Sequence, residues 1–371
     1  MSSESETQSR GAGVRFSLFG MPIKVPLSGL LGALVIAWLW TPTFASDGAS
    51  GVPLAAAFAV LLYLGILLHE LGHGLTARLL GNHVHGITLW ILGGFTSYER
   101  NRNTPGREAA IAVSGPLVTL LIAIGCFGAL AGFPQMPEMA WQLINALAVS
   151  NLLIGVLNLL PGLPLDGGGL VKAAVWAISR SEYRGTVVAA WCGRGLAIAF
   201  VLASFALALI PGATMGFTGL LVTGVFAVFL WLGATAHLRG AKLDRRIPSL
   251  SAASIARRAV PADGAESVAL AVQRCEQAQA GAIVVCDASG RATGIVNPAA
   301  LAAVPAERRP WLPVTSVTRA LGTDQAIPLS LTGNDLIRAL TESGREEMLV
   351  VDPDGAIFGV LFVDDVERSL T

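Results

Sequence analysis

The segment Leu61–Leu80, LLYLGILLHELGHGLTARLL, places three ionisable side chains in an apolar run long enough to cross a membrane. His69 and His73 are four residues apart, so both imidazoles project from one face of a helix. Two neutral imidazoles at this spacing can hold one Zn²⁺, and Glu70, turned away from the metal, can take a proton from water. An ionisable group at bilayer depth costs about 3 kcal/mol, so the segment predicts a functional site or a set of buried partners.

A third metal ligand is expected elsewhere in the chain, because catalytic zinc is usually held by three protein ligands. The run Asn158–Gly169, NLLPGLPLDGGG, offers Asp166, and its two prolines and four glycines disfavour a regular helix. Irregular backbone at membrane depth is tolerated only where it is buried in protein or lines a watery cavity. The run therefore predicts a broken span that brings Asp166 to a water-filled metal pocket.

Two other interpretations of these groups remain open. Glu108, at the start of the apolar run 108–133, is an alternative third ligand, although a carboxylate there also suits a helix N-terminus, which is the role we expect. A His/Glu cluster satisfied by neighbouring helices, as in a proton-coupled transporter, would also explain His69 and Glu70. It would not explain the break that carries Asp166.

Asn158 lies seven residues after Asn151 and hence on the same helix face. Hydrogen bonds between helices would satisfy both amides inside the bilayer. The place of Asn158 next to the break predicts a functional role for it, whereas we expect Asn151 to be structural.

His83 and His85 alternate with other residues in HVHGITLW, a pattern typical of a strand that turns both imidazoles to the same side. The pattern favours a strand over a second metal site. Segments 84–90 and 94–98 predict a membrane-associated β-hairpin, whose open edge could pair with an unwound peptide.

The composition is that of a membrane protein, since the 371 residues are 53% apolar and 13% charged, with a mean hydropathy of +0.63. Six apolar runs are long enough to cross a hydrocarbon core of about 30 Å. They are 25–45, 52–81, 108–133, 139–160, 191–211 and 215–237. A shorter apolar piece, 168–179, continues the fourth run beyond the break. The predicted fold is a polytopic α-helical membrane protein with about six transmembrane helices and a short β-hairpin, followed by a soluble α/β domain.

Charged residues are unevenly distributed: residues 1–238 carry 20 of the 50 charged side chains, and the shorter stretch 239–371 carries the other 30. This predicts a membrane domain over 1–238 and a soluble domain over 250–371. The balance of 25 basic against 25 acidic residues gives no electrostatic support for nucleic-acid binding.

Basic residues also predict the topology. They precede the first apolar run or follow the second, fourth and sixth, and the opposite loops have none. These residues are Arg10, Arg15 and Lys24; Arg100, Arg102 and Arg107; Arg180, Arg184 and Arg194; and Arg239, Lys242, Arg245 and Arg246. The positive-inside rule then predicts a multi-pass protein of the plasma membrane with both termini in the cytoplasm.

The soluble domain contains an internal repeat. AIVVCDASGRATGIVNPAAL (282–301) and EMLVVDPDGAIFGVLFVDDV (347–366) each predict a strand, an Asp/Gly turn, a second strand and a helix start. The two copies cover about 252–304 and 313–370. Neither copy can bury a good core alone, so we expect them to pack on each other.

HELGH together with NLLPGLPLDGG resembles the site-2 protease family of intramembrane zinc metalloproteases, peptidase family M50, over nearly all of residues 16–238. The repeat pair resembles the tandem CBS domains that a subgroup of this family carries. The resemblance implies that His69, His73 and Asp166 hold one Zn²⁺ per chain and that Glu70 is the catalytic acid/base. It also implies that Asn158 lies near the substrate carbonyl or oxyanion.

We therefore predict an intramembrane zinc metalloendopeptidase that cleaves transmembrane segments of other proteins within the lipid bilayer. One alternative is a membrane transporter gated by the CBS-like pair. Another is a catalytically silent membrane regulator, which would be expected to have lost part of the set His69, Glu70, His73 and Asp166.

The repeat pair lacks most of the residues expected of a nucleotide site. CBS pairs often hold a ribose with a hydroxyl residue and an Asp three positions later, and the resemblance places these letters at Asn297 and Ala300, and at Phe362 and Asp365. Only Asp365 matches. We therefore expect nucleotide binding to be weak or absent and the pair to serve packing or homodimerisation.

Overall fold

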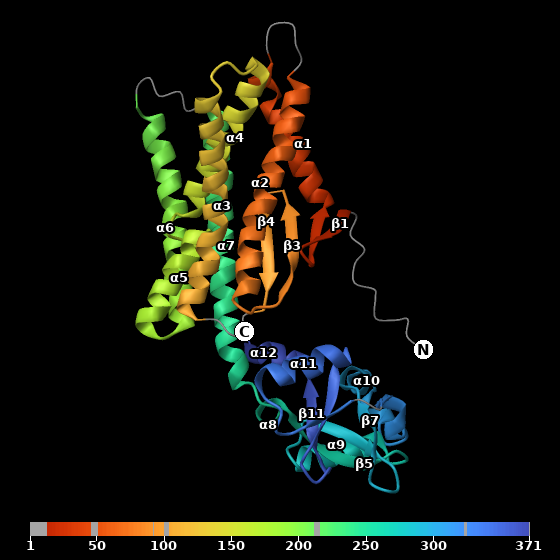
Figure 1. Cartoon of the computed structure of the whole chain (residues 1–371). Coiled ribbons are helices and arrows are strands. Elements are labelled where there is room, and N and C mark those ends of the chain that lie inside the picture. The colour runs from red at the N-terminus through yellow and green to blue at the C-terminus, as the bar shows by residue number, and fades with distance from the viewer. Residues whose placement is uncertain are drawn as a thin grey trace. The chain divides into compact units, whose positions relative to one another are not determined.

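The computed structural model describes residues 13–45, 51–91, 93–99, 104–210, 216–322 and 325–370, apart from the side chains of residues 217 and 218. Arg10, Arg100 and Arg102, which entered the topology argument, lie outside these residues. The chain divides into two compact units, Met1–Ala241 and Lys242–Thr371 (Figure 1).

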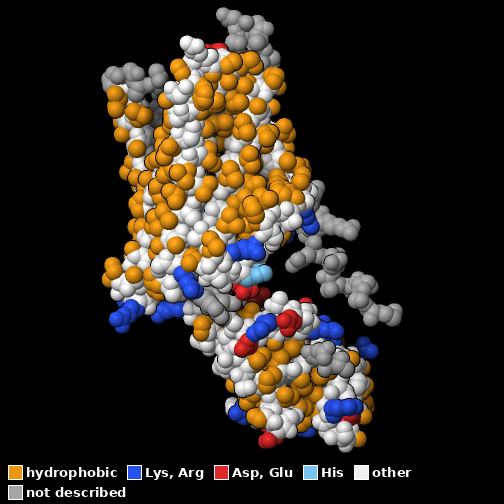
Figure 2. Space-filling model, viewed as in Figure 1, with side chains coloured by type: hydrophobic (Ala, Val, Ile, Leu, Met, Phe, Trp, Pro, Cys, Tyr) orange, Lys and Arg blue, Asp and Glu red, His pale blue; other side chains and the backbone are white. Residues whose placement is uncertain are grey.

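Within the described residues of the first unit, six helices are long and apolar enough to cross a membrane, which confirms the predicted spans. They are α1 (Leu27–Phe44), α2 (Val52–Leu79), α3 (Pro105–Gly132), α4 (Glu138–Asn158), α6 (Glu182–Ala208) and α7 (Phe217–Arg246). On the face shown in Figure 2, apolar side chains cover most of this unit and Lys and Arg side chains gather at one end. Arg194, expected between the fourth and fifth spans, instead lies within α6.

The predicted break in the fourth span lies between α4, which ends at Asn158, and the short helix α5 (Asp166–Ser179). The break is shorter than the predicted run, because Gly167, Gly168 and Gly169 lie in the first turn of α5. The segment between α4 and α5 is fixed on α6. The Leu163 backbone N–H donates to the Ala189 carbonyl at 3.0 Å, and the Leu163 carbonyl lies directly over Gly193. Asp166 therefore starts a helix whose first turn is positioned by α6.

A four-stranded sheet lies beside α2, in the order β1-β2-β3-β4. The strands are β1 (Gly13–Leu18), β2 (Met21–Pro26), β3 (Val84–Trp90) and β4 (Gly93–Tyr98). The antiparallel pair β3–β4 confirms the predicted hairpin. The β1–β2 hairpin was not predicted, and it joins the sheet because β2 runs parallel to β3, with Ile23 opposite Ile87.

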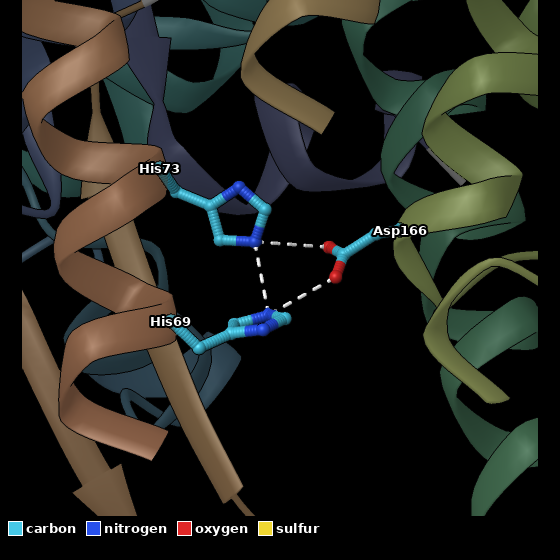
Figure 3. A group of neighbouring side chains, drawn as sticks. All are labelled: His69, His73 and Asp166. Carbon is cyan, nitrogen blue, oxygen red and sulfur yellow. Dashed lines mark hydrogen bonds and ion pairs between the residues drawn. The ribbon is translucent and has the colours of Figure 1, made fainter. Parts of the chain in front are cut away.

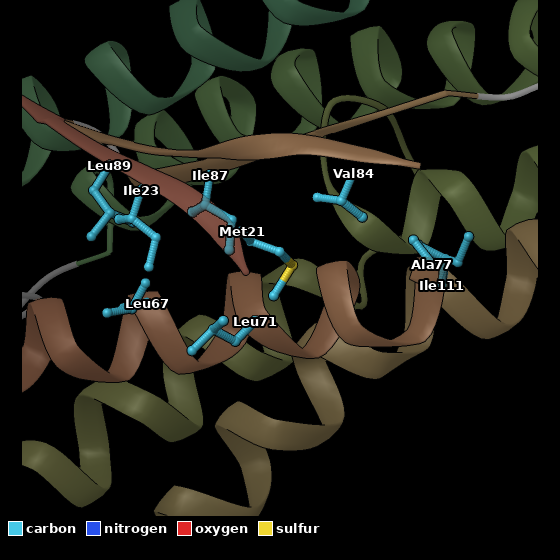
Figure 4. Packing of buried hydrophobic residues seen from close by; sticks show 9 residues of the cluster. All are labelled: Met21, Ile23, Leu67, Leu71, Ala77, Val84, Ile87, Leu89 and Ile111. Atoms are coloured by element: carbon cyan, nitrogen blue, oxygen red, sulfur yellow. The ribbon is translucent and has the colours of Figure 1, made fainter. Parts of the chain in front are cut away.

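One face of the sheet packs on α2 (Figure 4). The inward strand residues are Met21, Ile23, Val84, Ile87 and Leu89, and they meet Leu67, Leu71 and Ala77 of α2 and Ile111 of α3. Since these α2 residues lie within and on both sides of the segment His69–His73, the sheet holds the part of α2 that carries the predicted ligands. Strand β4 forms one edge of the sheet.

The second unit is built on a seven-stranded sheet, in the order β8-β7-β6-β5-β11-β10-β9. Its elements are η1 (Ile247–Ser249), α8 (Ala252–Ile255), β5 (Arg257–Asp263), α9 (Val268–Gln277), β6 (Ala282–Cys286), β7 (Ala292–Val296), α10 (Pro298–Ala302), η2 (Ala306–Arg308), η3 (Val314–Val317), β8 (Thr318–Ala320), β9 (Ala326–Pro328), α11 (Gly333–Ser343), β10 (Glu347–Val351), β11 (Ile357–Phe362) and α12 (Val363–Leu370).

The repeat predicted in this unit is confirmed. β5-α9-β6-β7-α10 and β9-α11-β10-β11-α12 share one topology, with a parallel first pair of strands and an antiparallel second pair. The copies join where β11 pairs with β5, and Val284, Ile295, Leu349 and Val360 form a core common to both.

We predict that Gly193→Ala destabilises the first unit, because an added Cβ would overlap the Leu163 carbonyl. Overpacking of this kind costs about 1–3 kcal/mol, so the thermal midpoint in detergent should fall by several degrees. Gly195→Ala is the matched control, since a Cβ at Gly195 on the same helix meets nothing within 4 Å. Equal midpoints for the two variants would contradict tight docking of the Leu163 segment on α6.

Candidate metal centre

Three side chains from two helices converge in the first unit (Figure 3). Nε2 of His73 lies 3.1 Å from Nε2 of His69, and both nitrogens face the Asp166 carboxylate at 3.1 Å for His69 and 3.2 Å for His73. His69 and His73 are buried, with 6% and 7% of their surface exposed. The structure thus brings together the three residues predicted as metal ligands.

The tautomer of His73 follows from its second ring nitrogen. Nδ1 lies 2.7 Å from the backbone carbonyl oxygen of Ile111 on α3. A carbonyl can only accept, so Nδ1 carries the proton and donates it. In the neutral ring, Nε2 then presents a lone pair toward His69 and Asp166.

His69 is oriented in the same way by the hydroxyl of Thr119. Its Nδ1 lies 2.7 Å from Thr119 Oγ1, and that hydroxyl donates its own proton to the Gly115 carbonyl at 3.2 Å. The hydroxyl oxygen must therefore accept from Nδ1–H, which leaves Nε2 of His69 without a proton. Both imidazoles are held for metal binding by groups that contact their outer nitrogens.

These residues fit a metal ion. Two unprotonated nitrogens and a carboxylate face one another at close to 3 Å with no proton among them, so their lone pairs repel in a buried setting. A divalent cation between them removes this repulsion. Two His and one carboxylate are also a ligand set of catalytic zinc.

Helix α3 can approach the ligands because Gly115 has no side chain. A Cβ at Gly115 would lie 2.7 Å from Nε2 of His69 and closer still to Nε2 of His73. The same helix supplies Thr119 and the Ile111 carbonyl. The close approach of α3 to α2 therefore both orients the imidazoles and leaves room between them.

Glu70 is buried beside the edge strand β4 and its carboxylate has a defined partner. The Thr96 hydroxyl of β4 lies 2.6 Å from Oε2 of Glu70 and donates to it. Within the described residues, Glu70 is not part of the three-residue cluster. Its predicted role in proton exchange stays a prediction.

Two cavities, of about 580 and 250 Å³, meet at the metal centre. Glu70, Asp166 and Phe229 are among the residues that line both. The smaller cavity is also lined by Asn158 and Asn151, which confirms that the two amides share a face. Asn151 donates to the Leu147 carbonyl of its own helix at 2.8 Å, whereas Asn158 faces the cavity at the end of α4.

Glu108 is not a member of the cluster; it lies in the first turn of α3, as expected, but it does not cap the helix. Thr104 caps α3 by accepting from the Arg107 backbone N–H, and Glu108 instead forms an ion pair with Lys172 of α5 at 2.9 Å. Lys172 also pairs with Glu182 at 2.8 Å. Glu108 and Lys172 are buried, at 7% and 3% exposure, and a buried ammonium requires such a partner.

His83 and His85 lie next to each other at the start of β3, with ring centroids 5.3 Å apart, as the strand pattern predicts. His85 faces Glu99 at 4.0 Å, and both side chains are exposed. Among the described residues, neither belongs to a group that could hold a metal.

Three hydrogen bonds at the site were not predicted from the sequence. They join Thr119 to His69, the Ile111 carbonyl to His73, and Thr96 to Glu70. A lone hydroxyl in an apolar span, as at Thr119, is a signal that it seeks a buried partner. Nothing in the sequence identifies that partner as His69.

The known proteins that are similar to this unit are described as peptidases or zinc metalloproteases. The model of Peptidase family M50 matches residues 57–140 and 135–202. The candidate zinc metalloprotease sll0528 of Synechocystis is 28% identical over 93% of this chain and 92% of its own length. The candidate zinc metalloprotease Rip3 of Mycobacterium tuberculosis is 38% identical over 50% of this chain, which spans about half (51%) of Rip3.

Solved structures are also similar to parts of this chain. The site-2 protease from Methanocaldococcus jannaschii aligns with 61% of this chain and 95% of its own, with 25% identity and a TM-score of 0.46. The CBS domain protein TA0289 from Thermoplasma acidophilum aligns with 33% of this chain and 72% of its own, with 20% identity and a TM-score of 0.26.

We predict that Gly115→Ala lowers the bound metal by about tenfold or more, because its methyl group would occupy the space beside both Nε2 atoms. The measurement is metal content per purified chain after dialysis against a weak chelator. Gly128→Ala on the same helix is the control, since a Cβ there meets nothing within 4 Å. Equal metal content in both variants would place the ion elsewhere.

Proposed function

Because the chain belongs to peptidase family M50 and is a multi-pass zinc metallopeptidase, we propose that it hydrolyses peptide bonds within the transmembrane segments of other proteins. The observation that carries the proposal is the convergence of His69, His73 and Asp166 at two cavities inside a unit of apolar helices. In this proposal the three residues hold one Zn²⁺ per chain.

Bound there, Zn²⁺ would supply the Lewis acidity that polarises a carbonyl and makes water a nucleophile at neutral pH. Glu70 accepts the proton of the attacking water and returns it to the leaving amine. The Thr96 hydroxyl donates to Oε2 of Glu70 and so leaves Oε1 to carry the proton. The carboxylate is thereby held in one orientation for both transfers.

Asn158 is proposed to donate its amide N–H to the carbonyl oxygen of the substrate, where negative charge develops. Its place on the wall of the smaller cavity, which Glu70 and Asp166 also line, supports this role. A helical substrate has no exposed scissile carbonyl, so the segment must unwind before it is cut. Its unwound backbone can pair with the edge strand β4, which lies beside Glu70.

The two alternative functions are less well supported. A silent regulator has no need of Nε2 lone pairs that Thr119 and the Ile111 carbonyl keep aimed at Asp166. A transporter would need a chain of ionisable groups across the bilayer, whereas the described cluster is a compact three-residue site.

We further propose that the protein resides in the plasma membrane with both termini in the cytoplasm. The basic residues that flank the spans support this orientation. Arg239, Lys242, Arg245 and Arg246 at the end of α7 are the largest such group.

The second unit is proposed to bind nucleotides weakly or not at all, because the polar groups at both candidate positions are already used. Asp365 accepts two hydrogen bonds from Arg257, at 2.6 and 2.9 Å, which lower the pKa of its carboxyl from the ordinary value. The Arg257 guanidinium also covers the Phe362 ring at 4.7 Å. In the other copy, Asn297 caps α10. Homodimerisation through this unit stays a prediction.

We predict that Glu70→Gln abolishes cleavage but keeps about one zinc per chain, because the side chain is not a ligand and loses only its proton exchange. General acid–base groups contribute about 10² to 10⁴ in rate, so uncut substrates should accumulate in cells that carry this variant. Intact membrane proteins of these cells are compared with those of wild-type cells by mass spectrometry.

Asp166→Ala is the companion variant and should lose both zinc and cleavage. If it kept stoichiometric zinc, the third ligand would have to be another residue. If Glu70→Gln cleaved as well as the wild type, the proposed chemistry would be wrong even with the metal site intact.

We also predict that AMP, ADP and ATP bind the full-length protein with a dissociation constant no tighter than about 1 mM, measured by equilibrium dialysis with labelled nucleotide. The reason is the engagement of Asp365 by Arg257. Tighter binding that disappears in Asp365→Ala would make the second unit a nucleotide sensor and overturn this expectation.

A further inference from the structure

Arg194 is a cation within α6 that faces α7. Its Nη2 donates to Thr235 Oγ1 at 3.0 Å, and its Cζ lies 4.9 Å from the ring centroids of both Trp191 and Trp231. Thr235 donates its own proton to the Trp231 carbonyl at 2.7 Å, so its oxygen acts as an acceptor toward the guanidinium. Two indole faces and one hydroxyl thus hold the guanidinium between the two helices.

In the described part of the chain, no acidic side chain compensates this cation. Within the described residues, no Asp or Glu forms an ion pair with Arg194, and its Nε is buried without a hydrogen-bond partner. A guanidinium cannot shed its proton in a protein, so its charge must be compensated by another group. The contacts to Trp191 and Trp231 stabilise the cation but do not neutralise it.

The surroundings of the group are those of a lipid-facing surface. Trp191 and Trp231 have 58% and 41% of their surface exposed, on helices that span the membrane. A counter-anion that reaches Arg194 therefore comes most directly from the bilayer.

Arg194 lies inside the hydrocarbon core, at a depth from which its side chain can extend toward the headgroup border. It lies 14 residues before the end of α6 at Ala208, which is about 21 Å along the helix. If Ala208 lies at one border of a hydrocarbon core of about 30 Å, Arg194 lies roughly 9 Å from the other border. An extended Arg side chain nearly covers this distance. Thr235 on α7 lies four residues before Arg239, which agrees with this depth.

We propose that Trp191, Arg194, Trp231 and Thr235 form a binding site for the phosphate of a phospholipid, in the leaflet at the Arg246 end of α7. The planar fork of Arg194 suits two phosphate oxygens, and the indole rings exclude water from that contact and lie along the acyl chains. The bound lipid joins α6 to α7. Because Phe229 of α7 lines both cavities at the metal centre, the lipid also steadies one wall of the site.

The test measures lipid retained by the full-length protein. Delipidated protein in a neutral detergent is titrated with phosphatidylglycerol, and bound lipid is counted by native mass spectrometry. The wild type should retain about one more lipid per chain than the Arg194→Gln variant. The affinity of this variant for phosphatidylglycerol should be about tenfold or more lower than that of the wild type. Arg184→Gln, on the same helix at an exposed position, is the matched control and should behave as the wild type.

Two further arms identify the ligand. Diacylglycerol, which lacks the phosphate, should not bind at this site, and inorganic phosphate should not compete at millimolar concentration, since it lacks the acyl chains. Thr235→Val and Trp231→Leu keep the charge of Arg194 and should each weaken binding several-fold, which covers the case in which Arg194→Gln fails to fold.

Equal retention of phosphatidylglycerol by the wild type and by the Arg194, Thr235 and Trp231 variants would overturn the proposal. Equal retention of diacylglycerol would overturn recognition of the phosphate, and competition by inorganic phosphate would overturn recognition of a lipid.

Discussion

The membrane unit depends on one constraint: three electron-pair donors with no proton between them must be held close together. Nε2 of His69 and Nε2 of His73 lie 3.1 Å apart, and each faces an oxygen of Asp166. Where the dielectric constant is low, such groups repel unless a cation lies among them and rigid neighbours hold them. The fold supplies the neighbours: the sheet packs on one face of α2, α3 closes on another, and α6 fixes the segment that ends at Asp166.

The parts of this arrangement that depend on local geometry could be predicted from the sequence. The spacing of two His residues on one helix face is local, and so are the break before Asp166 and the alternation that marks the β3–β4 hairpin. The β1–β2 hairpin could not be predicted, because it is stabilised by pairing with β3 some 60 residues away and by the burial of Met21 and Ile23 on α2. The Ile111 carbonyl that orients His73 has no sequence signature at all, since every residue has a carbonyl.

Glu108 shows why a correct local principle can leave the main partner of a residue unidentified. A carboxylate in the first turn of a helix interacts favourably with the helix dipole, but that gain is at most about 1 kcal/mol at an exposed position. Glu108 is buried, and an unpaired charge there would cost more than the dipole returns. Lys172 satisfies it and ties the first turn of α3 to α5. Since α3 holds His73 through Ile111 and α5 begins at Asp166, the ion pair keeps the two sides of the metal centre in register.

The bundle balances the charges at the metal centre and at Lys172 internally, but it does not balance the charge of Arg194. In the metal centre, the carboxylates of Asp166 and Glu70 would offset a divalent ion, so the loaded site is formally neutral and suits a buried setting. Lys172 is offset by Glu108. Arg194 has no carboxylate within ion-pair distance in the described part of the chain, and its two indole neighbours face outward. A cation that the protein leaves uncompensated within reach of the lipid headgroups is best stabilised by a headgroup phosphate, so lipid composition should act on the α6–α7 seam. That effect reaches the metal centre through Phe229, which lines both cavities, and through Gly193, which contacts Leu163.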